Sequence, residues 1–109
     1  SGHYTIEACV TSQFEQLVRI ITGMPLGSTK QRYPCVMVNI LGSDTVEGQY
    51  SFEGIEDVLG EDGIHLHLCG KQYTKKMKKI GHMTVLDKSL EVAEEKALKA
   101  LERIKIKPL

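Results

Sequence analysis

The chain has 109 residues and a mass of 12.2 kDa, and 41% of its residues are hydrophobic, which is enough for one modest core. Fourteen Lys and Arg residues balance fourteen Asp and Glu residues, so the composition argues against a nucleic-acid or membrane binder that works through bulk charge. Cys9, Cys35 and Cys69 lack paired spacing, and no apolar run approaches the ~20 residues of a membrane span, so we expect a cytoplasmic protein without disulfides.

The first residues predict a strand followed by a helix. The chain starts at Ser1 without an initiator methionine, and we expect it to be a piece of a longer polypeptide. Residues 4–10 have the pattern of a short strand. Ser12 and Glu15 form the capping-box pattern that begins a helix, and Gly23 ends it. This helix should bury one face, formed by apolar residues at helical spacing: Phe14, Leu17, Val18 and Ile21.

The middle of the chain predicts a loop, a strand and a second helix. Residues 25–34 have the composition of a connecting loop, so we place a boundary there. The apolar run 35–41 predicts a strand that is buried on both faces. Residues 43–62 carry many carboxylates and no Lys or Arg, and they predict a helix with a charged outer face that ends at Gly60. The apolar positions of that helix are Phe52, Ile55 and Leu59.

Two strands separated by a basic loop come next. Apolar and polar residues alternate over 64–68 after the Asp62-Gly63 turn, which indicates a strand. A basic loop over 71–79 leads to a further strand through Met83 and Val85.

The chain closes with a helix that begins at Asp87 or Ser89, with Pro108 beyond its end. Its apolar stripe consists of Leu90, Ala93, Ala97, Ala100, Leu101 and Ile104. The predicted order of elements is therefore β, α, β, α, β, β, α, which is typical of the α+β class.

Two groups of residues suggest chemistry by residue type alone. His65, His67 and Cys69 project from one face of a predicted strand, where alternate residues lie ~6.5 to 7 Å apart, so they could share a metal ion. No second pair of ligands with matched spacing accompanies them, so we favour hydrogen-bonded imidazoles and no metal. Ser1, His3 and Glu7 contain the residue types of a hydrolytic triad, but no nucleophile elbow accompanies them.

The basic loop is the strongest candidate binding site in the sequence. Five lysines lie within residues 71–79, and His82 follows them. This local positive charge suits a phosphate group or another small anion, and the alternative is a solvated surface loop. Tyr73 is the one aromatic residue among the lysines, which argues against nucleic-acid binding by base stacking.

Six sequence blocks support a family resemblance. They are Ser1-Gly-His-Tyr-Thr-Ile-Glu-Ala-Cys9, Thr11-Ser-Gln-Phe-Glu-Gln16, Gly23-Met-Pro-Leu-Gly27, Pro34-Cys-Val-Met-Val-Asn-Ile-Leu-Gly42, His65-Leu-His-Leu-Cys-Gly-Lys71 and Lys79-Ile-Gly-His-Met-Thr-Val85. In this order they resemble the C-terminal part of the N5-carboxyaminoimidazole ribonucleotide synthetase family of ATP-grasp enzymes. The similarity is weakest over residues 43–62.

The resemblance implies an enzyme of purine biosynthesis that uses ATP and bicarbonate to carboxylate 5-aminoimidazole ribonucleotide. It implies that residues 1–33 are the last strand and helix of an ATP-grasp domain, and that residues 34–109 form a small rudimentary single-hybrid-motif domain. ATP and Mg²⁺ would be bound mainly by residues upstream of Ser1, so this piece alone should be inactive. The expected partners are the missing N-terminal part of the same polypeptide and a second copy in a homodimer, with no nucleic acid and no membrane.

The resemblance also assigns roles to single residues. His3 matches the second histidine of the family's His-Asn-Ser-Gly-His block and implies polar positioning or proton transfer. Lys71 matches the lysine of Tyr-Gly-Lys, a ligand for the ribonucleotide phosphate. Lys78 and Lys79 match the last two residues of the family's Arg-Pro-Gly-Arg-Lys block, so a lysine replaces a phosphate-binding arginine at position 78.

Two other interpretations stay open at this point. One is a stand-alone anion-binding or protein-interaction module that uses the basic loop. The other is the matching piece of a biotin carboxylase or a glycinamide ribonucleotide synthetase, although those families lack this combination of the Ser-Gly-His-Tyr-Thr and His-Leu-His-Leu blocks.

Overall fold

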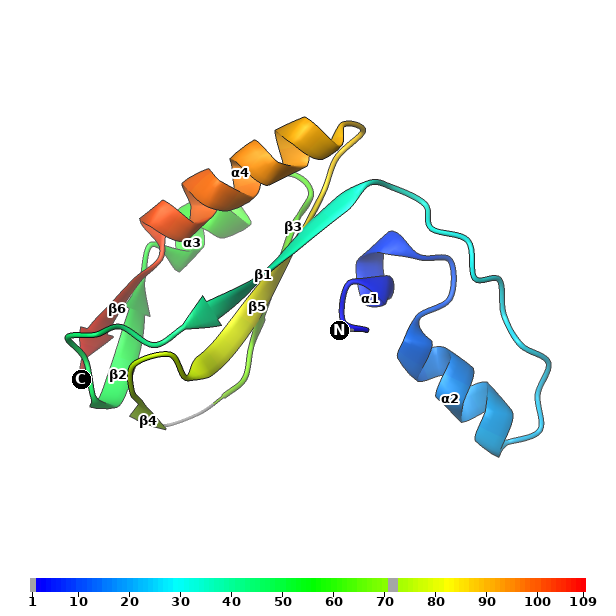
Figure 1. The fold of residues 1–109 in the computed structure, drawn as a ribbon, viewed down its shortest axis with the longest axis horizontal. Coiled ribbons are helices and arrows are strands. Elements are labelled where there is room, and N and C mark those ends of the chain that lie inside the picture. The colour runs from blue at the N-terminus through cyan, green and yellow to red at the C-terminus, as the bar shows by residue number, and fades with distance from the viewer. Residues whose placement is uncertain (1, 71–72) are drawn as a thin grey trace.

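Two small antiparallel sheets and one long helix dominate the computed structural model, which describes residues 2–70 and 73–109 (Figure 1). The first sheet has the strand order β1-β5-β3 and the second has the order β4-β2-β6. The strands are β1 (Cys35–Leu41), β2 (Gly48–Glu53), β3 (Ile64–Leu68), β4 (Tyr73–Thr74), β5 (Lys79–Leu86) and β6 (Lys105–Pro108). The helices are α1 (Thr5–Ala8), α2 (Gln13–Ile21), α3 (Ile55–Leu59) and α4 (Leu90–Arg103).

The central strand of the first sheet is β5, which is buried along most of its length. Met83 and Val85 pack with Ala93 and Ala97 of α4 in the hydrophobic core. Because side chains alternate along a strand, His82 and Thr84 point to the opposite face of the sheet. That second face, which lies away from α4, carries the polar residues of the candidate site.

Strand β1 was expected to be buried on both faces, and that expectation is wrong. It forms as a strand over the predicted residues, but it lies at the edge of the first sheet, and only Ile40 is buried. Continuous hydrophobicity does not show which of two apolar strands is central, because that depends on which strand pairs on both sides.

The predicted strand over 4–10 is also wrong, because residues 5–8 form the short helix α1. Its amides bond backward within the segment, from Thr5 to Gly2 and from Ala8 to Tyr4, at 3.1 and 3.0 Å. Only Cys9 makes a strand-like bridge, with Gln31. The β-branched residues favour a strand only where a neighbouring strand can pair with them, and α1 instead packs against β5.

Helix α2 begins as predicted but does not bury the predicted face. The hydroxyl of Ser12 accepts a hydrogen bond from the amide of Glu15 at 3.0 Å, which confirms the cap. The Glu15 carboxylate pairs with Arg19 instead of bonding back to the cap residue. Leu17 is 57% exposed and Ile21 is 73% exposed, so the apolar face of α2 has no cover within the described residues 2–70 and 73–109.

The acidic stretch 43–62 contains less helix than predicted. Phe52 lies on β2 and pairs with Ile106 of β6, and only α3 is helical. Gly54 separates the two elements with a φ of 87°, and a Cβ atom there would lie 1.9 Å from the carbonyl oxygen of Arg103. Strand β6 was not predicted, because Pro108 was placed beyond the end of the last helix.

Helix α4 confirms the last helix that the sequence predicted. Ala93, Ala97 and Ala100 of the predicted stripe are buried, whereas Leu90 is exposed. Ser89 is the N-cap residue, and its side chain makes no capping bond. Within the described parts of the chain, no helix is both long and apolar enough to cross a bilayer.

Candidate functional site

A pocket of about 300 Å³ lies on the polar face of the first sheet and brings together the first residues of the chain and residues 67–82 around β3 and β5. Its lining consists of His3, Ile6, His67, Leu68, Cys69, Lys79 and His82. His3 precedes α1, His67 is on β3, and Lys79 and His82 are on β5. The segment before α1 therefore meets the start of β5 at one site, and the roles of His3 and Lys79 there stay predictions.

Three imidazole rings form a stack in this pocket. The rings of His67 and His82 are nearly parallel, with centroids 4.7 Å apart and an interplanar angle of 17°. The ring of His3 lies on the same central ring, with its centroid 4.4 Å from that of His82 and a tilt of 42°. The antiparallel register of β3 and β5 places His67 directly opposite His82.

The carboxylate of Glu7 closes one end of the stack. Its Oε1 atom lies 2.6 Å from Nε2 of His67. An ionised carboxylate can only accept, so the imidazole donates this hydrogen bond. The Glu7 side chain is 12% exposed, and the contact joins α1 to β3 across 60 positions of sequence.

His82 is the most enclosed ring of the three, with 5% of its surface exposed. Its pKa is lowered from the ordinary value, first by desolvation and then by the positive charges of His3, His67 and Lys79, while Glu7 opposes this shift. His82 is therefore a neutral imidazole at pH 7. Its Nε2 atom is buried and has no hydrogen-bond partner among residues 2–70 and 73–109.

The end of the basic loop reaches the pocket at Lys79, after a strained turn at Met77. Lys78 and Lys79 are both half-buried, and the carbonyl oxygen of Lys78 accepts from the amide of Gly42 at 2.8 Å. Met77 has a φ of 65° in the left-handed region, which non-glycine residues rarely adopt. It stands where the resembling family has the glycine of Arg-Pro-Gly-Arg-Lys, so the turn keeps a glycine-like backbone without a glycine. The predicted phosphate ligand Lys71 lies outside the described residues.

The histidine and cysteine pattern that suggested a metal is divided between different surroundings. His67 belongs to the imidazole stack, whereas His65 is exposed and faces Thr84 of β5 across the pair of strands. In the part of the chain that the structure describes, no three His, Cys, Asp or Glu side chains are grouped closely enough to hold a metal ion. The histidine and cysteine side chains of this pattern therefore do not form a set of ligands that fits Mg²⁺.

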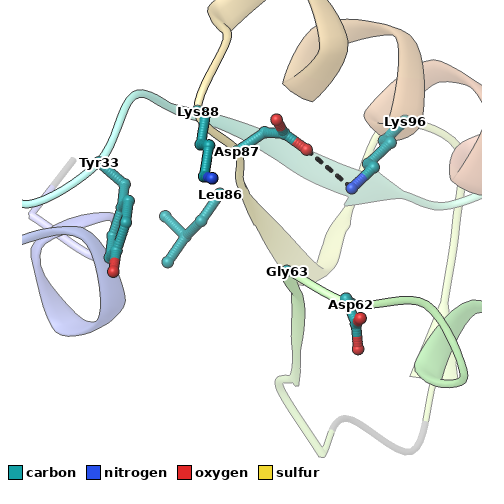
Figure 2. A pocket seen from close by; sticks show the side chains of 7 residues that line it. All are labelled: Tyr33, Asp62, Gly63, Leu86, Asp87, Lys88 and Lys96. Carbon is teal, nitrogen blue, oxygen red and sulfur yellow. Dashed lines mark hydrogen bonds and ion pairs between the residues drawn. The ribbon is translucent and has the colours of Figure 1, made fainter.

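A second cavity, of about 380 Å³, lies at the other end of the first sheet and contains none of the predicted site residues (Figure 2). Its lining consists of Tyr33, Asp62, Gly63, Leu86, Asp87, Lys88 and Lys96. Asp87 and Lys96 point toward each other and form an ion pair at 2.8 Å. The hydrogen bond from Lys96 lowers the pKa of Asp87, and Asp87 in turn raises the pKa of Lys96. This pair ties the start of α4 to its second turn, which is a structural role.

Sequence analysis did not identify Glu7, His67 and His82 as one group. Glu7 was considered in a hydrolytic triad and His67 in a metal site, and both ideas placed the residue beside the wrong neighbours. The available signal was the equal spacing of polar residues on the two strands, because His65 and His67 face Thr84 and His82 if the strands pair.

These features define a small mixed α/β domain whose polar sheet face carries a histidine-lined pocket beside lysines. Residues 35–96 match the family model of the phosphoribosylaminoimidazole carboxylase C-terminal domain. The chain therefore belongs to that family.

Solved structures and curated relatives agree with this assignment. The crystal structure of N5-carboxyaminoimidazole ribonucleotide synthetase from Thermotoga maritima is 50% identical, with a TM-score of 0.91, and the match covers all of this chain and 30% of that one. The curated N5-carboxyaminoimidazole ribonucleotide synthase of Aquifex aeolicus is 39% identical over 96% of this chain and 27% of its own length.

A third relative has been crystallised with ligands. N5-carboxyaminoimidazole synthase from Aspergillus clavatus, solved in complex with ADP and 5-aminoimidazole ribonucleotide, is 31% identical with a TM-score of 0.75, and the match covers 94% of this chain and 27% of that one. The chain thus spans less than a third of the length of these relatives.

Proposed function

We propose that this chain is the C-terminal part of an ATP-dependent ligase that carboxylates 5-aminoimidazole ribonucleotide with bicarbonate in purine biosynthesis. The observation that carries the proposal is the single pocket lined by both His3 and Lys79. Residues 1–33 would be the end of an ATP-grasp domain, and residues 34–109 the small C-terminal domain. The names of the similar proteins support the same reaction class.

The proposed reaction has two steps. Bicarbonate first takes the terminal phosphoryl group of ATP, which gives carboxyphosphate and ADP. The exocyclic amine of the ribonucleotide then forms a bond to the carboxyl carbon while the bond from that carbon to the phosphate oxygen breaks. The bonding pair leaves with phosphate, and the amine proton passes to a base. The His3 imidazole is the proposed base or polar positioning group.

The lysines of the basic loop are the proposed ligands of the ribonucleotide phosphate. Lys79 lines the pocket, and both it and the preceding Lys78 are half-buried. Lys71 and Lys78 join it in the proposal through the family resemblance. Ammonium groups supply rotatable charged donors, so a lysine at position 78 replaces the fixed fork of an arginine with a single point charge. Binding of phosphate should then depend more on charge than on bidentate geometry.

The remaining parts of the site would come from the rest of a longer polypeptide. ATP and Mg²⁺ are proposed to bind there, and Mg²⁺ would neutralise charge on the transferring phosphoryl group. The exposed apolar face of α2, including Leu17 and Ile21, is proposed to be covered by the same missing part. We also propose a cytoplasmic homodimer, as expected from the resemblance.

The test is steady-state kinetics of the full-length protein. ATP hydrolysis should require both bicarbonate and 5-aminoimidazole ribonucleotide. Lys79→Gln should raise the KM for the ribonucleotide at least about tenfold, because a charge-assisted phosphate contact contributes roughly 1.5–3 kcal/mol. Lys105→Gln on β6 is the matched control and should leave that KM unchanged. ATP hydrolysis that ignores the ribonucleotide would exclude the proposed function and favour an anion-binding module.

A further inference from the structure

The alternation of side chains along β5 breaks at the start of the strand. Met83 belongs to the hydrophobic core, whereas His82 lines the pocket on the other face of the sheet. If this alternation continued back along β5, Ile80 would point toward the pocket and Lys79 toward the core. The structure has the reverse, because Ile80 is fully buried in the core and Lys79 lines the pocket. The charged residue therefore reaches the pocket through an irregularity in the sheet.

That irregularity is a β-bulge in the pairing of β1 with β5. Ile40 lies opposite Gly81. The next residue of β1, Leu41, lies opposite Lys79, so the register skips Ile80. One extra residue in a strand turns the residues beyond it to the other face of the sheet, and bulges next to functional sites re-aim side chains in this way. The bulge thus moves Lys79 from the core face to the pocket face.

Gly42 fixes the shifted register at the end of β1. Its amide donates a hydrogen bond to the carbonyl oxygen of Lys78 at 2.8 Å. This bond continues the register in which Leu41 lies opposite Lys79. The carbonyl oxygen of Gly42 accepts a longer bond from the amide of Met77 at 3.4 Å. Gly42 therefore holds both of the residues that precede Lys79 in the basic loop.

Only a residue without a side chain fits at position 42. A Cβ atom there would overlap the carbonyl oxygen of Lys75, which is a backbone atom, and would lie 2.5 Å from Oγ1 of Thr74. Thr74 is 2% exposed, so its side chain has little room to move away. The φ of Gly42 is outside the left-handed region. The close approach of the loop, and not the backbone conformation of Gly42, therefore requires the glycine.

We infer that Gly42 is a positioning residue of the proposed carboxylation site, which holds the shifted register so that Lys79 faces the phosphate of the ribonucleotide. The inference rests on the proposed function. Gly42 does not line the pocket, so it acts through Lys79. A methyl group at position 42 would push residues 74–78 away from β1 and move the ammonium group of Lys79 out of its geometry. Affinity for the phosphate should then fall while the chemical step is unchanged.

The test is steady-state kinetics of full-length Gly42→Ala. The KM for 5-aminoimidazole ribonucleotide should rise at least about tenfold, as expected for Lys79→Gln, while kcat and the KM for ATP stay within about twofold of wild type. Gly60→Ala is the matched control and should change none of the three constants, because a Cβ atom there meets only ordinary contacts of 3.6 and 3.7 Å. An equal rise in both KM values, or an unchanged ribonucleotide KM, would overturn the inference.

A double variant shows whether the glycine acts through the lysine. Gly42→Ala combined with Lys79→Gln should have a ribonucleotide KM no higher than that of Lys79→Gln alone, because the second change removes the group that the first displaces. If the two effects multiply, Gly42 acts on something other than Lys79, and the inference is overturned.

Hydrogen exchange of the wild-type protein gives a readout that does not depend on whether Gly42→Ala folds. In full-length protein, the amide of Gly42 should exchange at least about a hundredfold more slowly than in an unstructured peptide, because it is bonded to Lys78. Inorganic phosphate should slow this exchange by at least about threefold more, since a ligand of the lysines stabilises the register that places them. Exchange that is fast, or that phosphate does not slow, would overturn the inference.

This readout also separates the inference from the proposed function, because it needs neither ATP nor the ribonucleotide. Slow, phosphate-sensitive exchange at Gly42 would support the positioning role even in a protein whose ATP hydrolysis ignores the ribonucleotide. That combination would overturn the proposed function alone.

Discussion

Nε2 of His67 and Oε1 of Glu7 lie 2.6 Å apart, and this contact joins the first ten residues of the chain to the first sheet. It is the link between the segment that carries His3 and the strands that carry Lys79 and His82. The position of the proposed base relative to the proposed phosphate ligands therefore depends on this partly buried hydrogen bond and on the ring contact between His3 and His82.

Glu7→Ala should loosen the docking of the first ten residues. Removal of one partner from a partly buried charged hydrogen bond costs about 1–3 kcal/mol, and the lower half of that range applies because His67 is 38% exposed. The measurement is the rate of limited proteolysis within residues 1–10 together with the urea midpoint. Glu53→Ala breaks an exposed pair and should change neither quantity measurably. Equal protection in both variants would contradict the role of the contact.

Stability should fall as the pH drops below about 6.5 because of His82. Its pKa is lower in the folded chain than in the unfolded chain, so the unfolded state takes up a proton first. The contribution is fully present above the unfolded value and is lost as the pH falls through the lowered folded value. Urea unfolding at pH 8, 7, 6 and 5.5 should show this loss in the wild type.

His82→Asn tests whether His82 causes this loss of stability at low pH. It should reduce the difference in unfolding free energy between pH 7 and pH 5.5, whatever its effect on stability at pH 8. Because each protein is compared with itself at the two pH values, any packing that the substitution removes affects both values and cancels. An identical pH dependence in wild type and variant would show that other groups cause it.

Met77→Gly should stabilise the turn that precedes β5. Met77 has a φ of 65°, and the left-handed conformation costs a residue with a side chain roughly 1–2 kcal/mol. Glycine removes that cost but adds up to about 1 kcal/mol of chain entropy in the unfolded state, so a net gain of about 0.5–1 kcal/mol is expected. Thermal unfolding measures this net gain in stability. Met77→Ala keeps a Cβ atom at this φ, and so keeps the backbone strain, so it should not raise the free energy of unfolding.

Ile21→Glu should destabilise a full-length protein although the residue is 73% exposed in this chain. If the missing part of the polypeptide covers α2, a charge in that contact should cost about 2 kcal/mol or more. Gln13→Glu, at the first position of the same helix, is the control and should be nearly neutral. A loss below about 0.5 kcal/mol for Ile21→Glu would show that the face stays in solvent.

The predictions that succeeded depended on neighbours in the sequence. The Ser12 cap, the strand at 64–68 and the helix after Ser89 all arise from contacts over a few residues, so local spacing was enough to place them. The predictions that failed concerned long-range pairing. Strand β6 exists because it pairs with β2, whereas residues 5–8 are helical and pair with no strand among residues 2–70 and 73–109.

Local patterning is sufficient to specify the main helix and the three strands of the first sheet, and the functional roles of His3 and the lysines stay predictions. Local patterning leaves open which strand is central, which face of the sheet is polar, and which side chains meet there. Those choices belong to the tertiary structure, because the register of β3 on β5 and the packing of α1 bring His67, His82, Glu7 and His3 together from distant positions. A hydrogen bond that spans 60 positions leaves no trace in the local spacing of either partner.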